Sequence, residues 1–458
     1  MSDALSRYLD ENRDRFIDDL KQALRIPSVS AKPEHKGDVE RCARHVAAEL
    51  KRVGMTIAEV IPTDGHPIVY AEWLGAPGKP TVLLYGHYDV QPPEPLELWK
   101  SPPFEPTMAD GTIRARGACD DKGQVYMHIK AVESHLRVNG KLPVNLKMVI
   151  EGEEEVGSVS LEAFLRKNAD RVRADVLVVS DTSMLDPGQP ALCYGLRGIL
   201  YTEVTLRATR RDLHSGEFGG SVPNAANALA ALIAALKDGD GRITIPGFYD
   251  RVRSLEPKER EHLRALPFDA KAFLSEAGVV GDVGEKGYTT LERLWTRPTL
   301  DVNGIWGGYT AAGSKTVIPA VAQAKISMRL VPDQDPEELF PRFEAYVKKL
   351  APPGAEVTVK DMHGCKPFLV SPEHPSIKAA QRALQRAWGK PAVLIREGGS
   401  VPVMHTFSEI LGLPCVLMGF GLHDDQVHAP NEKFSLSSFH GGTRSAAYLS
   451  EELAVSTG

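Results

Sequence analysis

The stretch that decides the fold runs from Thr81 to Val90 and reads TVLLYGHYDV. Its opening residues, TVLLY, form an apolar run that is typical of a short buried strand. The run ends at His87 and Asp89, and further along the chain RGACDDKG places Asp120 and Asp121 just before a predicted helix. Imidazole and carboxylate side chains brought together from separate strand ends are preferred ligands of zinc or manganese. Each motif alone is equally typical of a charged loop, but together they predict a metal site at the carboxyl ends of the strands.

Length and composition limit the class of protein. The chain has 458 residues, which predicts about two domains, and its 42% hydrophobic and 25% charged residues are typical of globular proteins. The net charge of -6, without a basic patch or a long apolar run, predicts neither a nucleic-acid partner nor a membrane span. The segment from Met1 to Ile17 is charged, and five scattered cysteines lack CxxC spacing. We therefore expect a reduced, cytoplasmic protein without a disulfide framework.

Two further apolar runs end in acidic side chains. Residues 144–150 lead into four glutamates, Glu151, Glu153, Glu154 and Glu155, and residues 176–179 lead into Ser180 and Asp181. Crowded carboxylates repel one another unless a cation neutralises them or one of them stays protonated. A solvated acidic turn remains an alternative for Glu151 and Glu153. Because strands alternate with helical patterns, we predict an α/β fold with a mostly parallel sheet covered by helices.

The helix predicted after Asp121 carries two histidines outside its apolar stripe. That stripe consists of Val125, Ile129, Val132 and Leu136. His128 and His135 lie off the stripe, so we expect both imidazoles to be solvated and neither to bind a metal.

The pattern changes in the second half of the chain. Three strands and one helix are predicted there, at residues 199–207, 321–331, 356–360 and 336–350. They indicate a smaller α+β domain of the split βαβ type, inserted as residues 198–372 between the catalytic parts 1–197 and 373–458. Residues 238–300 are rich in proline and charge, and we expect them to be irregular.

Seven ordered blocks of sequence carry a resemblance to a known family. They are Gly86–Val90, Gly117–Gly123, Glu154–Ser158, Ser180–Asp181, His214–Gly216, Arg396–Ser400 and His428–Glu432. With these blocks the chain resembles the M20 peptidases, a superfamily of dinuclear-metal aminoacylases and carboxypeptidases, and is similar to their carnosinase-like dipeptidase branch. The resemblance implies hydrolysis of the amide bond of dipeptides or similar small substrates that have a free C-terminal carboxylate. It also implies that the inserted domain is a lid and dimerisation domain.

The same resemblance implies two divalent metal ions per subunit, with zinc expected and manganese or cobalt as alternatives. The implied ligands are Asp120 as the bridge, His87 and Asp181 on one ion, and Glu155 and His428 on the other. His423 is the alternative to His428. The dipeptidase branch further implies a cis peptide bond between Asp120 and Asp121.

The resemblance also assigns roles beside the metals. Asp89 is implied to orient His87, and Glu154 to be the general base that moves a proton from water to the leaving amine. Glu153 is the alternative base, because a shift of one residue would exchange the two roles. The register of Val156–Ser158 favours Glu154.

In the inserted domain, the resemblance implies that His214 stabilises the oxyanion in the site of a neighbouring subunit, so a homodimer is expected. Arg329 is implied to pair with the substrate carboxylate. Thr316, Ser400 and His363 match substrate-contacting positions, and an ordinary structural role is the alternative for each. An N-acyl-amino-acid deacylase or carbamoylase is the alternative enzyme. An inactive small-molecule binder is disfavoured, because every expected ligand and base position is filled.

Overall fold

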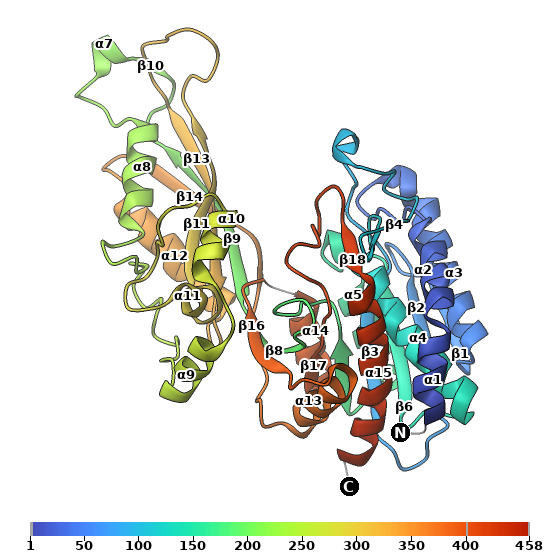
Figure 1. The fold of residues 1–458 in the computed structure, drawn as a ribbon. Helices are drawn as coiled ribbons and strands as arrows, with labels where there is room; N and C mark the ends of the chain where they lie inside the picture. The colour runs from blue at the N-terminus through green and yellow to red at the C-terminus, as the bar shows by residue number, and fades with distance from the viewer. Residues whose placement is uncertain (1–2, 400–401, 457–458) are drawn as a thin grey trace. The chain divides into compact units, whose positions relative to one another are not determined.

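The computed structural model describes residues 3–399 and 402–456 (Figure 1). The chain forms two compact units. The first contains Met1–Tyr194, Val370–Ile395 and Thr406–Gly458, and the second contains Gly195–Leu369 and Arg396–His405. The candidate metal ligands all lie in the first unit.

A twisted sheet forms the centre of the first unit. Its strands follow the order β1 (Ile57–Ile61), β2 (Ile68–Trp73), β6 (Asn145–Glu151), β3 (Thr81–His87), β7 (Val176–Val179), β17 (Cys415–Leu417) and β8 (Ala191–Leu196), and β16 (Val393–Glu397) pairs with β8. Strand β15 (Phe368–Leu369) pairs with Gly195 and Leu196, and these four residues belong to the second unit. The central strands β6, β3, β7 and β17 pair in parallel, whereas β1, β2 and β8 pair antiparallel to their neighbours. This confirms the predicted α/β fold with a mostly parallel central sheet, whose buried strands are almost continuously apolar.

Helices cover this sheet. They are α1 (Asp3–Glu11), α2 (Arg13–Leu24), α3 (Lys36–Val53), α4 (Lys122–Asn139), α5 (Leu161–Lys167), α6 (Ala169–Val172), α13 (Pro375–Trp388), α14 (Pro402–Leu411) and α15 (Leu436–Ser456). Helix α3 packs on β1 and β2, α4 on β3, and α13 on β17. Helix α15 packs along both α4 and α13 (Figure 1).

The expectation that the two histidines of α4 are solvated is wrong. His128 and His135 are 5% and 1% exposed, and every residue from Lys122 to His135 is buried. The physical reason is that α4 has protein on several sides: α1, α2, α3 and α15 all pack against it in addition to β3. The face opposite an apolar stripe is solvated only where nothing else covers the helix.

A small three-stranded sheet brings two distant loops together. Strand β5 (Thr112–Arg114) pairs antiparallel with both β4 (Thr107–Ala109) and β18 (Lys433–Ser435). The loop after β5 and the loop before β18 therefore lie side by side, and the Ala115 N–H donates to the Glu432 carbonyl over 3.1 Å. These two loops contain Asp120 and His428.

The second unit has an antiparallel sheet of its own. Its order is β11 (Thr299–Gly307), β13 (Val321–Leu330), β9 (Gly198–Arg207) and β14 (Glu356–Cys365), and β10 (Leu213–His214) pairs separately with β12 (Val317–Ile318). Helices α8 (Ala225–Ala235) and α12 (Pro336–Leu350) share an apolar core with this sheet, in which Leu229, Ile326 and Phe343 are buried. Short helix α7 (Ser215–Phe218) follows β10.

The prediction that residues 238–300 are irregular is wrong. This segment contains α9 (Pro257–Ala265), α10 (Ala270–Glu276) and α11 (Thr290–Thr296), and β11 begins at Thr299. Each helix begins with a recognisable signal: a proline in the first turn of α9, an Asp269 cap on α10, and a Thr289–Glu292 capping box on α11. These helices are too short to give a clear apolar period, so the high content of proline and charged residues led to the prediction of an irregular segment.

All five cysteines are free and buried, as expected for a chain without a disulfide framework. Among the described residues, no helix is long and apolar enough to cross a membrane.

Candidate metal centre

His87 lies at the carboxyl end of β3 and is fully buried. Its Nε2 atom is 2.9 Å from Oδ1 of Asp120 and 3.8 Å from Oδ2 of Asp181. Asp181 comes just after β7, which is a parallel neighbour of β3, so both strands end at the same edge of the sheet. Together these three residues offer ligand atoms within 4.8 Å of one another.

A second group shares Asp120 with the first. His428 Nε2 lies 2.9 Å from Oδ2 of Asp120 and 3.2 Å from Oε2 of Glu155, and the three residues again offer ligand atoms within 4.8 Å. Asp120 thus turns one carboxylate oxygen toward each histidine. The alternative, His423, is in neither group among the residues that the structure describes. The expected cis peptide bond between Asp120 and Asp121 is present.

Asp89 connects both groups through hydrogen bonds. The Nδ1 atom of His87 lies 3.1 Å from the Asp89 carbonyl oxygen and 3.3 Å from its Oδ1. The same carboxylate accepts the backbone N–H of Glu154 at 3.3 Å and that of Glu155 at 3.1 Å. Asp89 therefore restrains an imidazole of the first group and the turn that carries a carboxylate of the second.

The charge balance of the two groups fits divalent cations. Burial alone would lower the pKa of His87, but hydrogen bonds to Asp120 and Asp89 outweigh it and raise that pKa well above its usual value. Hydrogen bonds to Asp120 and Glu155 raise the pKa of His428 to about 10. The carboxylates thus draw positive charge onto both imidazoles. In addition, the buried Nε2 of His87 faces carboxylate oxygens of Asp120 and Asp181 at 2.9 and 3.8 Å, and nitrogen and oxygen atoms of these types are ligands that zinc prefers.

Backbone strain also marks this site. His428 has a φ of +62°, which is the left-handed region that non-glycine residues rarely adopt. Such a conformation costs on the order of 1–3 kcal/mol and persists mainly where surrounding structure imposes it, often at functional sites.

The acidic turn after β6 separates into residues with different surroundings. Burial and the nearby carboxylates Asp181 and Asp120 raise the pKa of Glu154 to about 9, although His87 acts in the opposite direction. Glu153 is 6% exposed, and its two oxygens accept the backbone N–H groups of His66 and Ser160 at 2.9 and 3.0 Å. The carboxylate of Glu153 is therefore engaged by the backbone, whereas that of Glu154 interacts with the candidate ligands.

The solvated-turn alternative is wrong for both Glu151 and Glu153, because both are buried. Glu151 accepts hydrogen bonds from Tyr85 Oη at 2.6 Å and Ser158 Oγ at 2.9 Å. Buried acids with such partners are structural parts of the turn rather than surface charge.

Two supporting residues were not predicted. Glu432 is 1% exposed; its oxygens accept the N–H groups of Gly117, Cys119 and Asp120 at 2.9–3.1 Å, and Arg116 Nη1 at 2.7 Å. Gln91 donates to Oε2 of Glu155 at 2.7 Å. Glu432 is the last residue of the block His428–Glu432, and its place in that block could have indicated a supporting role. Gln91 has no such signal.

The remaining candidates lie in the second unit. His214 is exposed on β10, and the Ser215 N–H donates to the Thr316 carbonyl at 3.0 Å, which places Thr316 beside it. Arg329 is half-buried on β13, and His363 on β14 stacks on Tyr201 at 5.2 Å between ring centroids. Ser400 lies outside the described residues.

Comparisons with known proteins agree with this geometry. The model of peptidase family M20/M25/M40 matches residues 83–452. The chain is 34% identical to a Cys-Gly metallodipeptidase, dug1, of Schizosaccharomyces pombe, covering 99% of this chain and 98% of that protein. It is 33% identical to the human Beta-Ala-His dipeptidase over 98% of this chain and 92% of that one. The crystal structure of human carnosine dipeptidase 1 superimposes with a TM-score of 0.83 at 31% identity, covering 98% of each chain. The chain therefore belongs to peptidase family M20, a family of metal-dependent hydrolases.

Proposed function

We propose that this protein is a metal-dependent dipeptidase that hydrolyses the amide bond of dipeptides or similar small substrates with a free C-terminal carboxylate. The observation that carries the proposal is the position of the Asp120 carboxylate between two groups of possible metal ligands. One of its oxygens faces His87 in the first group, and the other faces His428 in the second. The similarity to Cys-Gly and Beta-Ala-His dipeptidases over nearly the whole chain supports a dipeptide substrate over an N-acyl amino acid.

Two divalent cations would be held by five residues: His87, Asp181, Glu155, His428 and, between the two sites, Asp120. Zinc suits these nitrogen and oxygen donors, and manganese or cobalt would also be accepted. When bound, such ions polarise the amide carbonyl and make water more acidic.

Glu154 is the general base in this proposal. It takes a proton from the attacking water and gives it to the nitrogen of the leaving amine. Without cations its pKa is raised to about 9, chiefly by burial. Positive charge at the neighbouring ligands would lower that pKa and leave the carboxylate ready to accept a proton near neutral pH. Asp89 keeps His87 oriented and holds the turn that carries Glu154.

The second unit supplies substrate-recognition groups in this proposal. Arg329 pairs with the substrate carboxylate, because guanidinium offers two parallel donors, and Thr316, His363 and Ser400 contact the remainder of the substrate. His214 donates to the oxyanion in the site of a second subunit.

A homodimer through the second unit follows from that role. Strand β11 is an edge strand of its sheet, and Ile305, Trp306 and Tyr309 on it and in the following loop are 56%, 41% and 44% exposed. Edge strands and apolar patches of this kind are candidates for pairing with another chain.

The base is tested with a matched pair of variants. Glu154→Gln should keep two bound ions and lose on the order of a hundredfold or more in kcat, because a positioned base contributes about that much. Glu153→Gln should keep kcat close to that of the wild type, since Glu153 contacts the backbone. The measurements are metal content and turnover of a dipeptide panel. Full activity of Glu154→Gln, or activity restricted to N-acyl amino acids, would contradict the proposal.

The dimer is tested by complementation. His214→Ala and Glu154→Gln proteins, each nearly inactive alone, are mixed under conditions of demonstrated subunit exchange. If His214 acts across the dimer, one site of each mixed dimer contains an intact base and an intact histidine, and activity returns. Continued inactivity would show that His214 does not serve the neighbouring subunit.

A further inference from the structure

His128 makes one hydrogen bond that reaches the metal centre. Its Nε2 atom lies 2.7 Å from Oγ of Ser180, and the same Oγ donates to the carbonyl oxygen of Met418 over 2.7 Å. All three groups are buried. Ser180 stands between the last residue of β7 and the candidate ligand Asp181. The bond therefore ends at the residue immediately before a ligand.

The number of hydrogens available shows which atom is the donor in each of these two hydrogen bonds. A serine hydroxyl has one hydrogen, and the hydroxyl of Ser180 uses it on the Met418 carbonyl, which can only accept. The hydrogen between His128 and Ser180 must therefore be on Nε2 of His128. His128 acts as a donor, and its tautomer is set by the carbonyl of Met418, the residue that follows β17.

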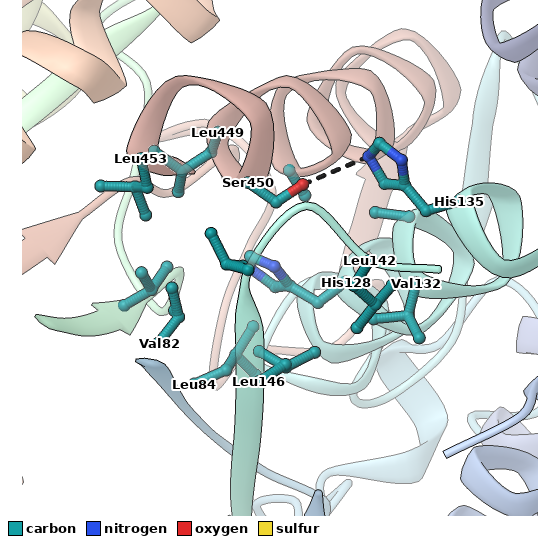
Figure 2. A pocket seen from close by; sticks show the side chains of 14 residues that line it. Val82, Leu84, His128, Val132, His135, Leu142, Leu146, Leu449, Ser450 and Leu453 are labelled. Carbon is teal, nitrogen blue, oxygen red and sulfur yellow. Dashed lines mark hydrogen bonds between the residues drawn. The ribbon is translucent and has the colours of Figure 1, made fainter. Parts of the chain in front are cut away.

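The surroundings of His128 keep it neutral. The residue lines a cavity of about 50 Å³ between α4, α15 and the sheet, whose walls include Val82, Leu84, Leu146 and Leu449 (Figure 2). Burial lowers the pKa of His128 to about 3. An uncharged imidazole can serve as a constant donor close to the metal centre without adding positive charge to it.

We propose that His128 is a positioning residue of the metal centre, which fixes Asp181 through the hydroxyl of Ser180. This inference rests on the proposed function, because it assumes that Asp181 binds a metal. Helix α4 begins at Lys122, directly after the ligand Asp120 and the adjacent Asp121, so one rigid helix sets the positions of two ligands of the same ion. The start of α4 fixes Asp120, and His128, about two turns further along the helix, fixes Asp181 through Ser180.

The protein provides a matched control in His135. This residue lies two turns further along α4, is equally buried, and lines the same cavity (Figure 2). Its Nε2 atom contacts the Ala447 carbonyl at 2.9 Å and Ser450 Oγ at 3.2 Å, both in α15, which carries none of the proposed ligands. Replacing His135 removes a buried imidazole from the cavity and leaves the Ser180 hydroxyl untouched.

The test measures binding of cobalt(II) to chelator-treated protein by its visible absorption and by competition with a chelator. His128→Asn should weaken one of two bound ions about ten- to a hundredfold, the usual effect of removing a supporting hydrogen bond. His128→Gln should restore binding, because its amide nitrogen takes the place of Nε2, whereas that of asparagine takes the place of Nδ1. Ser180→Ala should match His128→Asn, and His135→Asn should bind like the wild type.

The outcomes separate the inference from the proposed function. Equal cobalt affinity in His128→Asn, Ser180→Ala and the wild type would overturn the positioning role while leaving the dipeptidase proposal intact. Equal weakening in His128→Asn and His135→Asn would also overturn it, because the effect would then come from packing. A wild-type protein that takes up no cobalt would overturn the proposed function and this inference with it. If His128→Asn does not fold, Ser180→Ala, which removes only one oxygen, decides the question.

Discussion

Two clusters of acidic side chains in the first unit have similar geometry and different sources of positive charge. The first is the candidate metal centre around Asp120. The second, which we call the helical acid cluster, consists of Asp19, Glu49 and Glu133 on α2, α3 and α4. The candidate metal centre contains two sets of three residues, and the helical acid cluster is one such set; within each set the ligand-type atoms lie within 4.8 Å of one another.

The helical acid cluster is neutralised by the protein itself. Lys130, fully buried, places its Nζ 2.6 Å from Asp19 and 3.4 Å from Glu133, and it also pairs with Glu49. Arg15 and Arg52 reach the same acids from the outside.

In the candidate metal centre, by contrast, the ionisable nitrogen partners of Asp120 and Glu155 are imidazoles, and the part of the chain that the structure describes offers these two acids no lysine or arginine. The comparison shows that proximity of carboxylates does not identify a metal site. We expect a metal instead where carboxylates and imidazoles lie together and no lysine or arginine neutralises them.

The largest expected effect comes from removing one acid from each cluster. Asp120→Ala should release at least one ion and abolish turnover, because this carboxylate faces both groups. Asp19→Ala should retain two ions per chain, since Lys130 occupies the position that a cation would take. Metal analysis of the two purified variants makes the comparison. Two tightly held ions in Asp120→Ala would contradict the assignment of Asp120 as a metal ligand. Loss of an ion in Asp19→Ala would show that the helical acid cluster binds a metal.

Removing the central cation of the helical acid cluster should have a large effect on stability. Lys130→Met leaves three acids facing an apolar side chain, and breaking a buried ion pair in this way costs about 3–5 kcal/mol in the free energy of unfolding. The control is Lys21→Met on α2, whose lysine pairs with the exposed Asp18 and whose loss should cost below about 1 kcal/mol. Urea unfolding of both variants measures the difference. A loss in Lys130→Met no greater than that in Lys21→Met would mean that the helical acids are stabilised by something other than Lys130.

The proximity of the candidate metal ligands could be predicted from the sequence better than that of the helical acid cluster, for a physical reason. Strand ends bearing His87 and Asp181 are local patterns, and parallel strands bring them to one edge of the sheet without further information. The seven blocks of the family resemblance added Glu155 and His428.

Contacts between distant segments could not be predicted in the same way. Helix α15 lies some 300 residues from α4 along the chain, and the sequence around His128 and His135 contains no signal that α15 packs over these two histidines. Glu432 reaches the Asp120 loop across a sequence separation of 312 residues or more. The same applies to Lys130, whose partners Asp19 and Glu49 come from two other helices.

The smallest expected effect is the pH dependence of the helical acid cluster. Burial would raise the pKa of Glu49, but hydrogen bonds from Arg52 and Lys130 outweigh it and lower the pKa to about 2, below the usual 4.5 of a glutamate. A carboxyl whose pKa is lower in the folded protein stabilises the fold above the unfolded pKa, and that contribution disappears as the pH falls from about 4.5 toward 2. After allowance for solvent screening, we expect about 1–2 kcal/mol from Glu49 near pH 6.

Glu49→Gln should therefore be less stable than the wild type by about 1–2 kcal/mol at pH 6, and the two should converge as the pH falls toward 2. Urea unfolding across this range measures the difference, and metal-free protein is needed because protonation of metal ligands would otherwise add its own pH dependence. Glu40→Gln, half-buried on the same helix with its side chain 44% exposed, is the control and should change stability by less than about 0.5 kcal/mol. A difference between Glu49→Gln and the wild type that stays constant down to the lowest pH would mean that the effect comes from the altered packing of the amide. Convergence would instead show that charge holds this cluster together, and that Lys130 and Arg52 do there what a cation is proposed to do at Asp120.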